Sequence, residues 1–333
     1  MSEKQEQQNT ERSRMLGTME MRKLVPTVSV PIMVSMLVQA LYNIVDGIFV
    51  GQYSPDALTA VNLAMPMQML MIAVSTGMGT GINSLISRRL GEKRPHEARD
   101  AARHGILIEV IGWVVIVGLF FARMYIGMTN PKAEVLEMGT LYLRIVCTLS
   151  LGQFMSICFE RMMQATGNTT LSMITQLSGA VTNIILDPIL IFSCQMGIAG
   201  AAVATVIGQV VSCAVGFTLN QWKNRELRLT HEGFRFDWKT VQNILVVGIP
   251  STIMQAISSV CTTLMNMILA GFGDIYVNVL GVYFKLQSFV FMPVFGLCNG
   301  MVPIVGYNFG AQKYDRLLRV LRLAVIAATI ITT

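Results

Sequence analysis

The stretch LVPTVSVPIMVSMLVQALYNIVDGIFV, residues 24–50, contains a single charged side chain, Asp46. About 20 consecutive apolar residues in a helix are enough to cross the roughly 30 Å of hydrocarbon in a bilayer, so this stretch predicts a membrane-spanning helix. The whole chain is 53% hydrophobic and only 13% charged, whereas a soluble domain has about 25% charged residues. The composition therefore predicts an all-α, polytopic membrane protein.

Apolar runs of spanning length recur along the whole chain. We read them at residues 24–50, 58–87, 105–122, 139–159, 170–193, 198–219, 241–271, 275–307 and 317–333. That makes nine predicted spans, the last of which reaches the end of the sequence.

The basic residues indicate how these spans are oriented. Of the 25 Lys and Arg residues, 20 lie before the first span, between the second and third, between the sixth and seventh, and around the start of the ninth. The other connections have almost none, the exceptions being Arg123 and Lys132. The positive-inside rule places basic loops in the cytoplasm, so we expect a cytoplasmic N-terminus and cytoplasmic even-to-odd loops. Basic groups placed in this way belong to loops beside a bilayer, and we expect no nucleic-acid partner.

An internal repeat divides the sequence at an offset of 219 residues. At this offset Pro31 matches Pro250, and further matches join Gln68 to Gln287, Gly77 to Gly296, Gly81 to Gly300 and Gly91 to Gly310. The copies are six spans apart, an even number, so both should have the same orientation across the membrane, as in transporters with parallel repeats. We expect the glycines to mark close helix packing.

The repeat also predicts a domain organisation. A polar N-terminus at 1–23 precedes a first six-helix lobe at 24–220, a basic inter-lobe loop at 221–240, and the first three helices of a second lobe at 241–333. Two parallel six-helix repeats would make twelve helices, of which about nine are present, so we expect the chain to be incomplete at its C-terminus.

Two carboxylates lie inside predicted spans at a similar depth. Helix rise places Asp46 about 7 Å and Asp187 about 10 Å below the outer ends of their spans, and Thr205 about 12 Å below. Asn183 is four residues before Asp187, and Tyr42 is four residues before Asp46, so each shares a helical face with its acid. These residues predict a polar pocket in the outer half of the first lobe.

This pocket has two interpretations. Each acid could simply hydrogen-bond a neighbour and hold two helices together. Alternatively, two carboxylates in a medium of low dielectric resist joint ionisation, so one of them should take up a proton or bind a cation near neutral pH. Pro31 and Pro188 would let both acid-bearing helices bend, although prolines are also common in membrane helices.

Other charged residues are weaker candidates. Lys285 lies about 15 Å deep in its span, where it could face a transport cavity or serve as a structural partner, and Asn43 is a further cavity candidate. Glu109 lies near a span end, from which it could snorkel to the interface. Glu160 and Arg161 are expected to anchor a cytoplasmic loop.

Several motifs together resemble one family. They are LYNIVDGIFVG (41–51), GMGTGINSLISRRLG (77–91), QATGNT (164–169), NIILDPILIF (183–192), GIAGAAVAT (197–205) and FKLQSF (284–289). The chain resembles the multidrug and toxic compound extrusion (MATE) family, most closely its MepA-like bacterial branch, over nearly its whole length after residue 15.

The resemblance implies an activity and a site. Members have twelve helices in two lobes and export cationic and amphiphilic drugs from bacteria, across the cytoplasmic membrane, by antiport with protons or sodium. Asp46, Asn183, Asp187 and Thr205 match the first-lobe site for the proton or Na⁺, and Tyr42 matches a tyrosine beside it. Pro31 matches the proline at which the first helix bends. The resemblance implies a monomer, and no cofactor besides the coupling ion.

Two alternatives remain open at the level of sequence. A flippase for a lipid-linked saccharide shares the architecture, but it is expected to line its cavity with cationic groups that hold pyrophosphate. A non-transporting receptor or an intramembrane enzyme belongs to a different class. No set of nucleophile, base and oxyanion donors is recognisable in the sequence, so we do not expect an enzyme.

Overall fold

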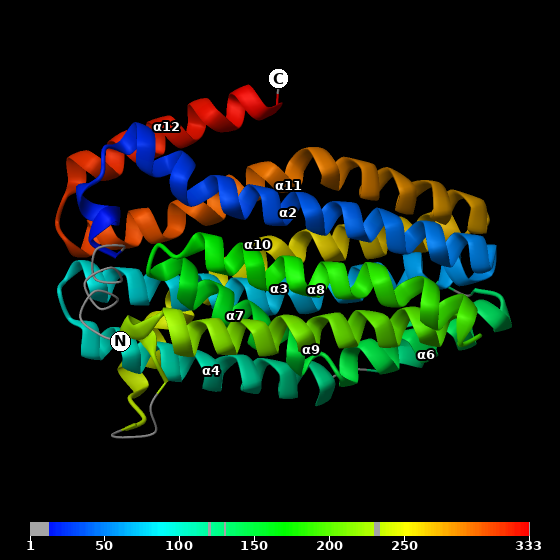
Figure 1. Cartoon of the computed structure of the whole chain (residues 1–333). Coiled ribbons are helices and arrows are strands. Elements are labelled where there is room, and N and C mark those ends of the chain that lie inside the picture. Colours follow the sequence, from blue (N-terminus) through cyan, green and yellow to red (C-terminus); the bar gives the residue numbers. More distant parts are fainter. Residues whose placement is uncertain (1–12, 119–120, 130, 230–233, 333) are drawn as a thin grey trace.

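The computed structural model describes residues 13–118, 121–129, 131–229 and 234–332, and this part of the chain is helical without strands. The long helices lie side by side, and α12 departs from the bundle at one end (Figure 1). The elements are α2 (Met21–Tyr53), α3 (Pro55–Gly91), α4 (Pro95–Gly118), α5 (Ala122–Gly127), α6 (Ala133–Thr148), α7 (Leu151–Ala165), α8 (Thr169–Pro188), η1 (Ile189–Ser193), α9 (Ile198–Lys223), η2 (Arg225–Leu227), α10 (Trp238–Ala270), α11 (Asp274–Gly310) and α12 (Tyr314–Thr332). The predicted all-α membrane fold is confirmed.

Three of the nine predicted spans differ from a single straight spanning helix in the structure. By length and composition, six described helical segments can cross a membrane, or up to eight if two bent helix pairs each count as one span. The predicted span 139–159 is one of these pairs, because α6 ends at Thr148 and α7 starts at Leu151 after a bend of 47°. The predicted span 275–307 is the other, because α11 is bent by 48° between Phe289 and Phe291. The predicted span 317–333 belongs to α12, which falls outside this set.

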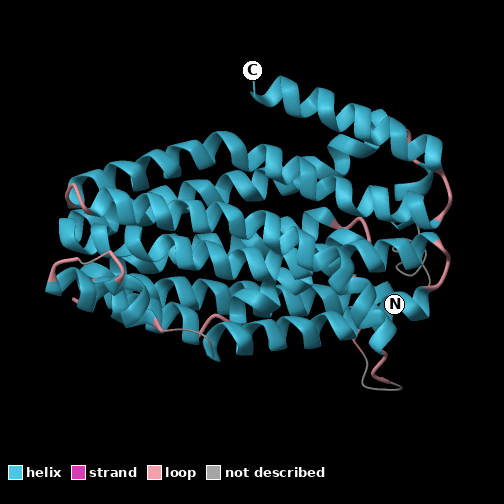
Figure 2. Ribbon diagram, turned by 180° about the vertical axis from the view of Figure 1, so that it is seen from behind, coloured by secondary structure: helices cyan, strands magenta, loops and turns pink. Residues whose placement is uncertain are grey.

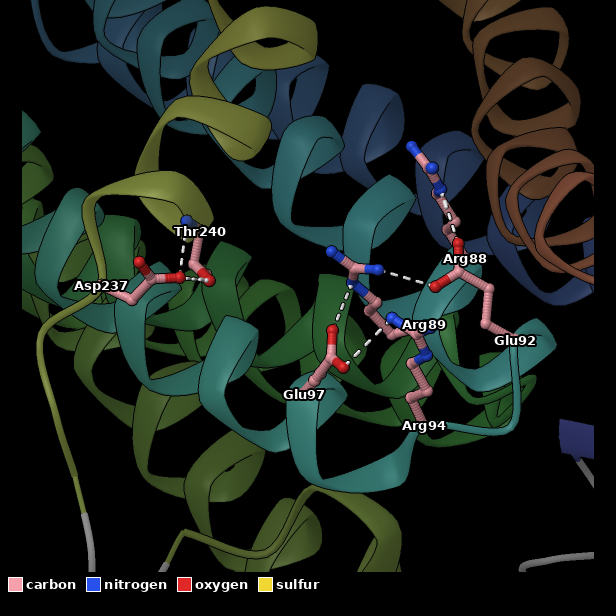
Figure 3. A network of polar contacts seen from close by, with 7 residues as sticks. All are labelled: Arg88, Arg89, Glu92, Arg94, Glu97, Asp237 and Thr240. Atoms are coloured by element: carbon pink, nitrogen blue, oxygen red, sulfur yellow. Dashed lines mark hydrogen bonds and ion pairs between the residues drawn. The ribbon is translucent and has the colours of Figure 1, made fainter.

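The basic loops gather at one end of the bundle, which we call the basic end. Figure 3 shows the turn between α3 and α4, where Arg89 pairs with Glu92 at 2.7 Å and with Glu97 at 3.1 Å. The start of α10 lies beside this turn, and the backbone N–H of Asp237 donates to His104 Nε2 of α4 at 2.9 Å. The loops predicted to face the cytoplasm therefore share one end of the molecule.

The two predicted lobes meet through paired helices. We call α2–α9 lobe one and α10–α12 lobe two. Helix α3 of lobe one packs along α10, α11 of lobe two packs along α2, and α3 and α11 also pack against each other. The view from behind in Figure 2 shows the same long helices lying side by side.

Repeated glycines let these helices touch backbone to backbone. A β-carbon added at Gly77 would lie 2.6 Å from Thr252 Cα, and one added at Gly296 would lie 2.7 Å from Met33 Cα. Thr252 and Met33 are themselves related by the offset of 219 residues. The same contact is thus made twice, once from each copy, which confirms that the glycines of the repeat serve close helix packing.

The contact recurs near the basic end. A β-carbon at Gly91 would lie 3.0 Å from the carbonyl carbon of Tyr307, and one at Gly310 would lie 3.0 Å from that of Arg88. Tyr307 and Arg88 again differ by 219 residues. The lobes are therefore related by an approximate twofold axis that runs between α3 and α11.

Replacing one of these glycines should loosen the interface. We expect Gly77→Ala to destabilise the protein by about 1–3 kcal/mol, the range for overpacking, because its methyl group would meet the backbone of α10. The measurement is thermal denaturation of detergent-solubilised protein. Gly118→Ala is the control, since nothing lies within 4 Å of its added carbon. Equal melting temperatures for the two variants would contradict the backbone contact.

A short N-terminal helical stretch, residues 13–18, crosses the basic end. Ser13 Oγ donates to Glu226 Oε1 of η2 at 2.8 Å. The carbonyl of Leu16 accepts from Asn308 Nδ2 at 2.9 Å, and that of Met19 accepts from Arg316 Nη2 at 2.7 Å. This stretch therefore connects the inter-lobe loop to lobe two.

The contact of Glu226 makes stability depend on pH. Burial raises the pKa of Glu226 from 4.5 to about 7, against the opposing effects of Ser13 and Arg14. The folded state therefore favours the protonated form of Glu226. This contribution to the free energy of unfolding is lost as the pH rises towards 7. We expect the Glu226→Gln variant to gain on the order of 2 kcal/mol over the wild type between pH 5 and pH 8.

Thermal denaturation across that pH range measures this difference. Glu20→Gln, the same change at an exposed side chain of the basic end, should follow the wild type at every pH. A Glu226→Gln curve parallel to that of the wild type would rule out the pH effect.

Candidate coupling site

The acid of α8 lies at a point where the helix changes its geometry. Asp187 is fully buried and precedes Pro188, which has no N–H to donate to the carbonyl of the preceding turn. Helix α8 ends at Pro188 and the chain continues as one turn of π-helix, η1. Such π-turns are frequent at functional sites, and this one leaves Asp187 at the end of a regular helix.

Asn183 connects Asp187 to α9. In the orientation of the amide that satisfies its neighbours, Asn183 Nδ2 donates to Asp187 Oδ2 at 3.1 Å, and its carbonyl oxygen accepts from the backbone N–H of Thr205 at 3.2 Å. Thr205 Oγ1 donates to the carbonyl of Ala201 at 3.0 Å. The structure thus brings together three of the predicted site residues, Asn183, Asp187 and Thr205.

Asp46 faces this group from α2. Its charge and that of Asp187 lie close enough to interact, and Tyr42 lies beside both carboxylates. Asp46 Oδ1 is buried without a hydrogen bond to any described residue. The predicted polar residues therefore lie near one another, with Asp187 bonded to an amide and one oxygen of Asp46 unpartnered among the described residues.

One member of the cluster was missed by the sequence reasoning. Tyr142 of α6 is buried beside Asp46 and Asp187, and its hydroxyl accepts from Gln68 Nε2 of α3 at 3.2 Å. Tyr142 carries no sequence signal of its own, because α6 and α7 were read as one straight span. Gln68, by contrast, is among the residues that recur at the repeat offset.

Lys285 approaches the cluster from lobe two. A β-carbon at Gly47 would lie 3.2 Å from Lys285 Cε and closer still to its ammonium group. Gly47 directly follows Asp46, and Lys285 is the cation whose charge acts on that carboxylate. The absence of a side chain at Gly47 therefore makes room for a lysine of lobe two beside the acid of lobe one.

Two predicted residues stand apart from the cluster. Asn43 is half-buried and has no hydrogen bond to a residue that the structure describes. Pro31 lies about 22 Å along α2 from Asp46, and α2 is a single helix through both Pro26 and Pro31. Pro31 therefore does not touch the acids, and bending of α2 at this proline stays a prediction.

The arrangement suits binding of a small cation. Two carboxylates and a hydroxyl are oxygen ligands that hard cations prefer, and the Asn183 amide would add its oxygen by turning it from the Thr205 N–H towards the acids. The same carboxylates in a medium of low dielectric can instead hold a proton. Either ligand would relieve the repulsion between Asp46 and Asp187.

Two parallel repeats and a polar site inside a helical bundle define a multi-spanning membrane transporter. The MatE family model matches residues 31–189 and 250–333, and the chain belongs to this family of multidrug and toxic compound extrusion transporters. The predicted resemblance is confirmed.

Curated relatives include the multidrug export proteins MepA of two staphylococci. The protein from Staphylococcus aureus (strain N315) is 27% identical over 310 residues, which cover 91% of this chain and 68% of the relative. The one from Staphylococcus saprophyticus is 26% identical over 308 residues, with the same coverage.

Solved structures agree with this assignment. The MATE multidrug transporter DinF-BH, solved as a complex with a small molecule, is 32% identical, with a TM-score of 0.88 over 95% of this chain and 72% of that one. An outward-facing multidrug resistance MATE transporter of the MOP superfamily is 27% identical, with a TM-score of 0.86 over 95% of this chain and 71% of that one.

The hydrogen bonds of Asn183 should be measurable in the stability of the protein. Asn183→Leu keeps the volume but removes the donor to buried Asp187, and we expect it to cost about 1–3 kcal/mol, the penalty for an unsatisfied buried polar group. Thermal denaturation in detergent measures the effect. Asn43→Leu makes the same change at a half-buried side chain outside this network and should be nearly neutral. Equal melting temperatures of the two variants would show that the hydrogen bonds of Asn183 do not stabilise the site.

Proposed function

We propose that the protein is a secondary active multidrug efflux transporter, which exports cationic or amphiphilic compounds by antiport with protons or sodium. The observation that carries the proposal is the pair Asp46 and Asp187, from different helices, with Asp187 fully buried. A carboxylate inside a membrane costs several kcal/mol unless it is neutralised. A pair of acids of this kind binds one cation and releases that cation only when a second cation neutralises the acids in its place.

The relatives support drug export. The staphylococcal relatives are multidrug export proteins, and DinF-BH is a multidrug transporter. A MOP superfamily transporter from Pyrococcus furiosus, 26% identical with a TM-score of 0.85 over 95% of this chain and 71% of that one, has a binding pocket whose reverse polarity suggests a different function. The polarity of the pocket is thus a useful criterion.

By this criterion a flippase for a lipid-linked saccharide is disfavoured. A cavity that holds pyrophosphate is expected to carry several cationic groups. Around Asp46 and Asp187 the residues identified are Tyr42, Tyr142 and one cation, Lys285. The acids outnumber the basic group, which favours a cationic substrate.

The geometry supports a mechanism of competition. When the acids are ionised, a drug cation or the Lys285 ammonium can neutralise Asp46. When a proton or Na⁺ enters from outside, it binds between Asp46 and Asp187 and weakens the attraction for the drug, which leaves. We expect α2 to bend at Pro31 during this step, because the proline leaves the carbonyl of Thr27 without its helical hydrogen bond.

Both coupling ions fit the residues present. Na⁺ would take oxygen ligands from Asp46, Asn183, Asp187 and Thr205, whereas a proton needs only one carboxylate. The protein would act as a monomer in the bacterial cytoplasmic membrane, with the basic end in the cytoplasm and with small drugs and the lipid bilayer as its partners.

Removing either acid charge should uncouple export from the ion gradient. We expect Asp46→Asn and Asp187→Asn to lower ethidium efflux by roughly 5- to 150-fold, the range of a typical coupling free energy. The measurement is gradient-driven flux in proteoliposomes, with a proton gradient and a sodium gradient imposed separately. Asp315→Asn, the same change at an exposed residue of the basic end, is the matched control.

The outcome decides between the readings of the site. Efflux at wild-type rates from both variants, at equal protein levels, would show that the acids only hold helices together. Flux that needs no gradient at all would instead point to a different class of protein.

A further inference from the structure

A second set of buried ionisable groups lies in lobe one, away from the coupling site. Glu109 of α4 is 1% exposed, and Glu160 and Arg161 of α7 are 8% and 4% exposed. The sequence suggested that Glu109 snorkels from a span end and that Glu160 and Arg161 anchor a loop. The prediction for Glu109 is wrong, because α4 places this side chain in the interior of the lobe.

Arg161 is held between α3 and its own helix. A β-carbon at Gly79 of α3 would lie 2.8 Å from Arg161 Cγ, so the glycine makes room for the arginine. Arg161 Nη1 donates to Gln164 Oε1 at 3.0 Å, and Gln164 Nε2 donates to Ser172 Oγ of α8 at 2.9 Å. The guanidinium is thereby fixed in the interior.

Two carboxylates compete for this one guanidinium. The charge of Arg161 acts on both Glu160 and Glu109. Glu160 Oε1 also accepts a long hydrogen bond of 3.5 Å from Ser156 Oγ. If all three groups were ionised, the cluster would hold one uncompensated negative charge, which a buried site does not tolerate.

Glu109 is the poorer place for that charge. Neither of its carboxylate oxygens forms a hydrogen bond with a described residue, and Ser75 Oγ and Arg161 Nε are likewise buried and unpartnered. Ser75 of α3, Arg161 and the Cys158 thiol of α7 are the polar or ionisable groups that face this carboxylate. Unpartnered polar atoms of α3 and α7 thus lie around the unpartnered carboxylate of Glu109 on α4.

The cluster is separate from the coupling site. Ser172, which connects to Arg161 through Gln164, is fifteen residues before Asp187 on α8, about 22 Å along the helix axis towards the basic end. The charges that act on Asp46 and Asp187 are those of Lys285 and Asp46, and not those of Glu109, Glu160 or Arg161.

We propose that Glu109 is a second proton-binding group of lobe one, whose carboxyl group holds a proton near Glu160 and Arg161, whose charges attract each other. The bound proton makes the cluster electrically neutral. Its O–H group supplies a hydrogen bond that Ser75 Oγ can accept, and Glu160 is then the carboxylate of the cluster whose negative charge offsets that of Arg161. On deprotonation the proton passes to water, and the cluster regains its excess negative charge.

Infrared difference spectroscopy of the purified protein tests this proposal without any transport assay. Protonated carboxyl groups give a carbonyl band that ionised groups lack, so the spectrum at neutral pH reports which acids carry a proton. We expect Glu109→Gln to lose the signal of one protonated side chain, and the Asp46→Asn, Asp187→Asn double variant to keep that signal. Glu137→Gln, at an exposed glutamate of α6, should match the wild type.

Thermal denaturation at neutral pH gives a second readout. Glutamine mimics a protonated glutamate, so Glu109→Gln should leave the melting temperature unchanged. Glu160→Gln should lower it, because the buried Arg161 loses its anionic partner.

An unchanged carbonyl band in Glu109→Gln would overturn the proposal. So would a Glu109→Gln melting temperature lowered as far as that of Glu160→Gln, because Glu109 would then be the ionised partner of Arg161. Neither result depends on drug export, so failure of this proposal and failure of the coupling role are distinguishable.

Discussion

Backbone contact between the two lobes is the constraint on which the rest of the molecule depends. Lipid tails are as apolar as the side chains they touch, so helices in a membrane associate through close packing. Here Gly77 and Gly296 bring α3 onto α10 and α11 onto α2. The second contact holds α11 against the helix of Asp46, and thereby places Lys285 of lobe two beside Gly47. The charge environment of the coupling site thus follows from a glycine interface.

Within lobe one, α8 organises the polar groups. Ser172, Thr175, Asn183 and Asp187 are all buried residues of this helix, spaced so that they lie on one face. Towards the basic end, Ser172 accepts from Gln164 and the carbonyl of Thr175 accepts from Ser212 of α9. Towards the other end, Asn183 connects Asp187 to α9. One helix face therefore serves both buried acid clusters.

Much of this could be predicted from the sequence, because a bilayer makes polar residues rare and their positions informative. Helix rise alone brought Asp46, Asp187 and Thr205 to one depth, and the recurrence of Gly77 at Gly296 predicted the packing. The bend between α6 and α7 could not be predicted, because hydropathy records length and polarity but not direction, and with it the position of Tyr142 was lost. Glu109 was misjudged for a related reason: distance from a span end does not say which face of the helix meets the interior.

The two buried clusters of lobe one share the same imbalance of charge. The coupling site has Asp46 and Asp187 with one cation, Lys285, and the inner cluster has Glu109 and Glu160 with one cation, Arg161. Each therefore needs one more positive charge to be neutral in a medium of low dielectric. The two clusters differ in which group can supply this positive charge. Lys285 belongs to the other lobe, and in the proposed mechanism a drug cation takes its place beside Asp46. Arg161 is packed against Gly79 within lobe one, and in our proposal a proton on Glu109 supplies the missing positive charge.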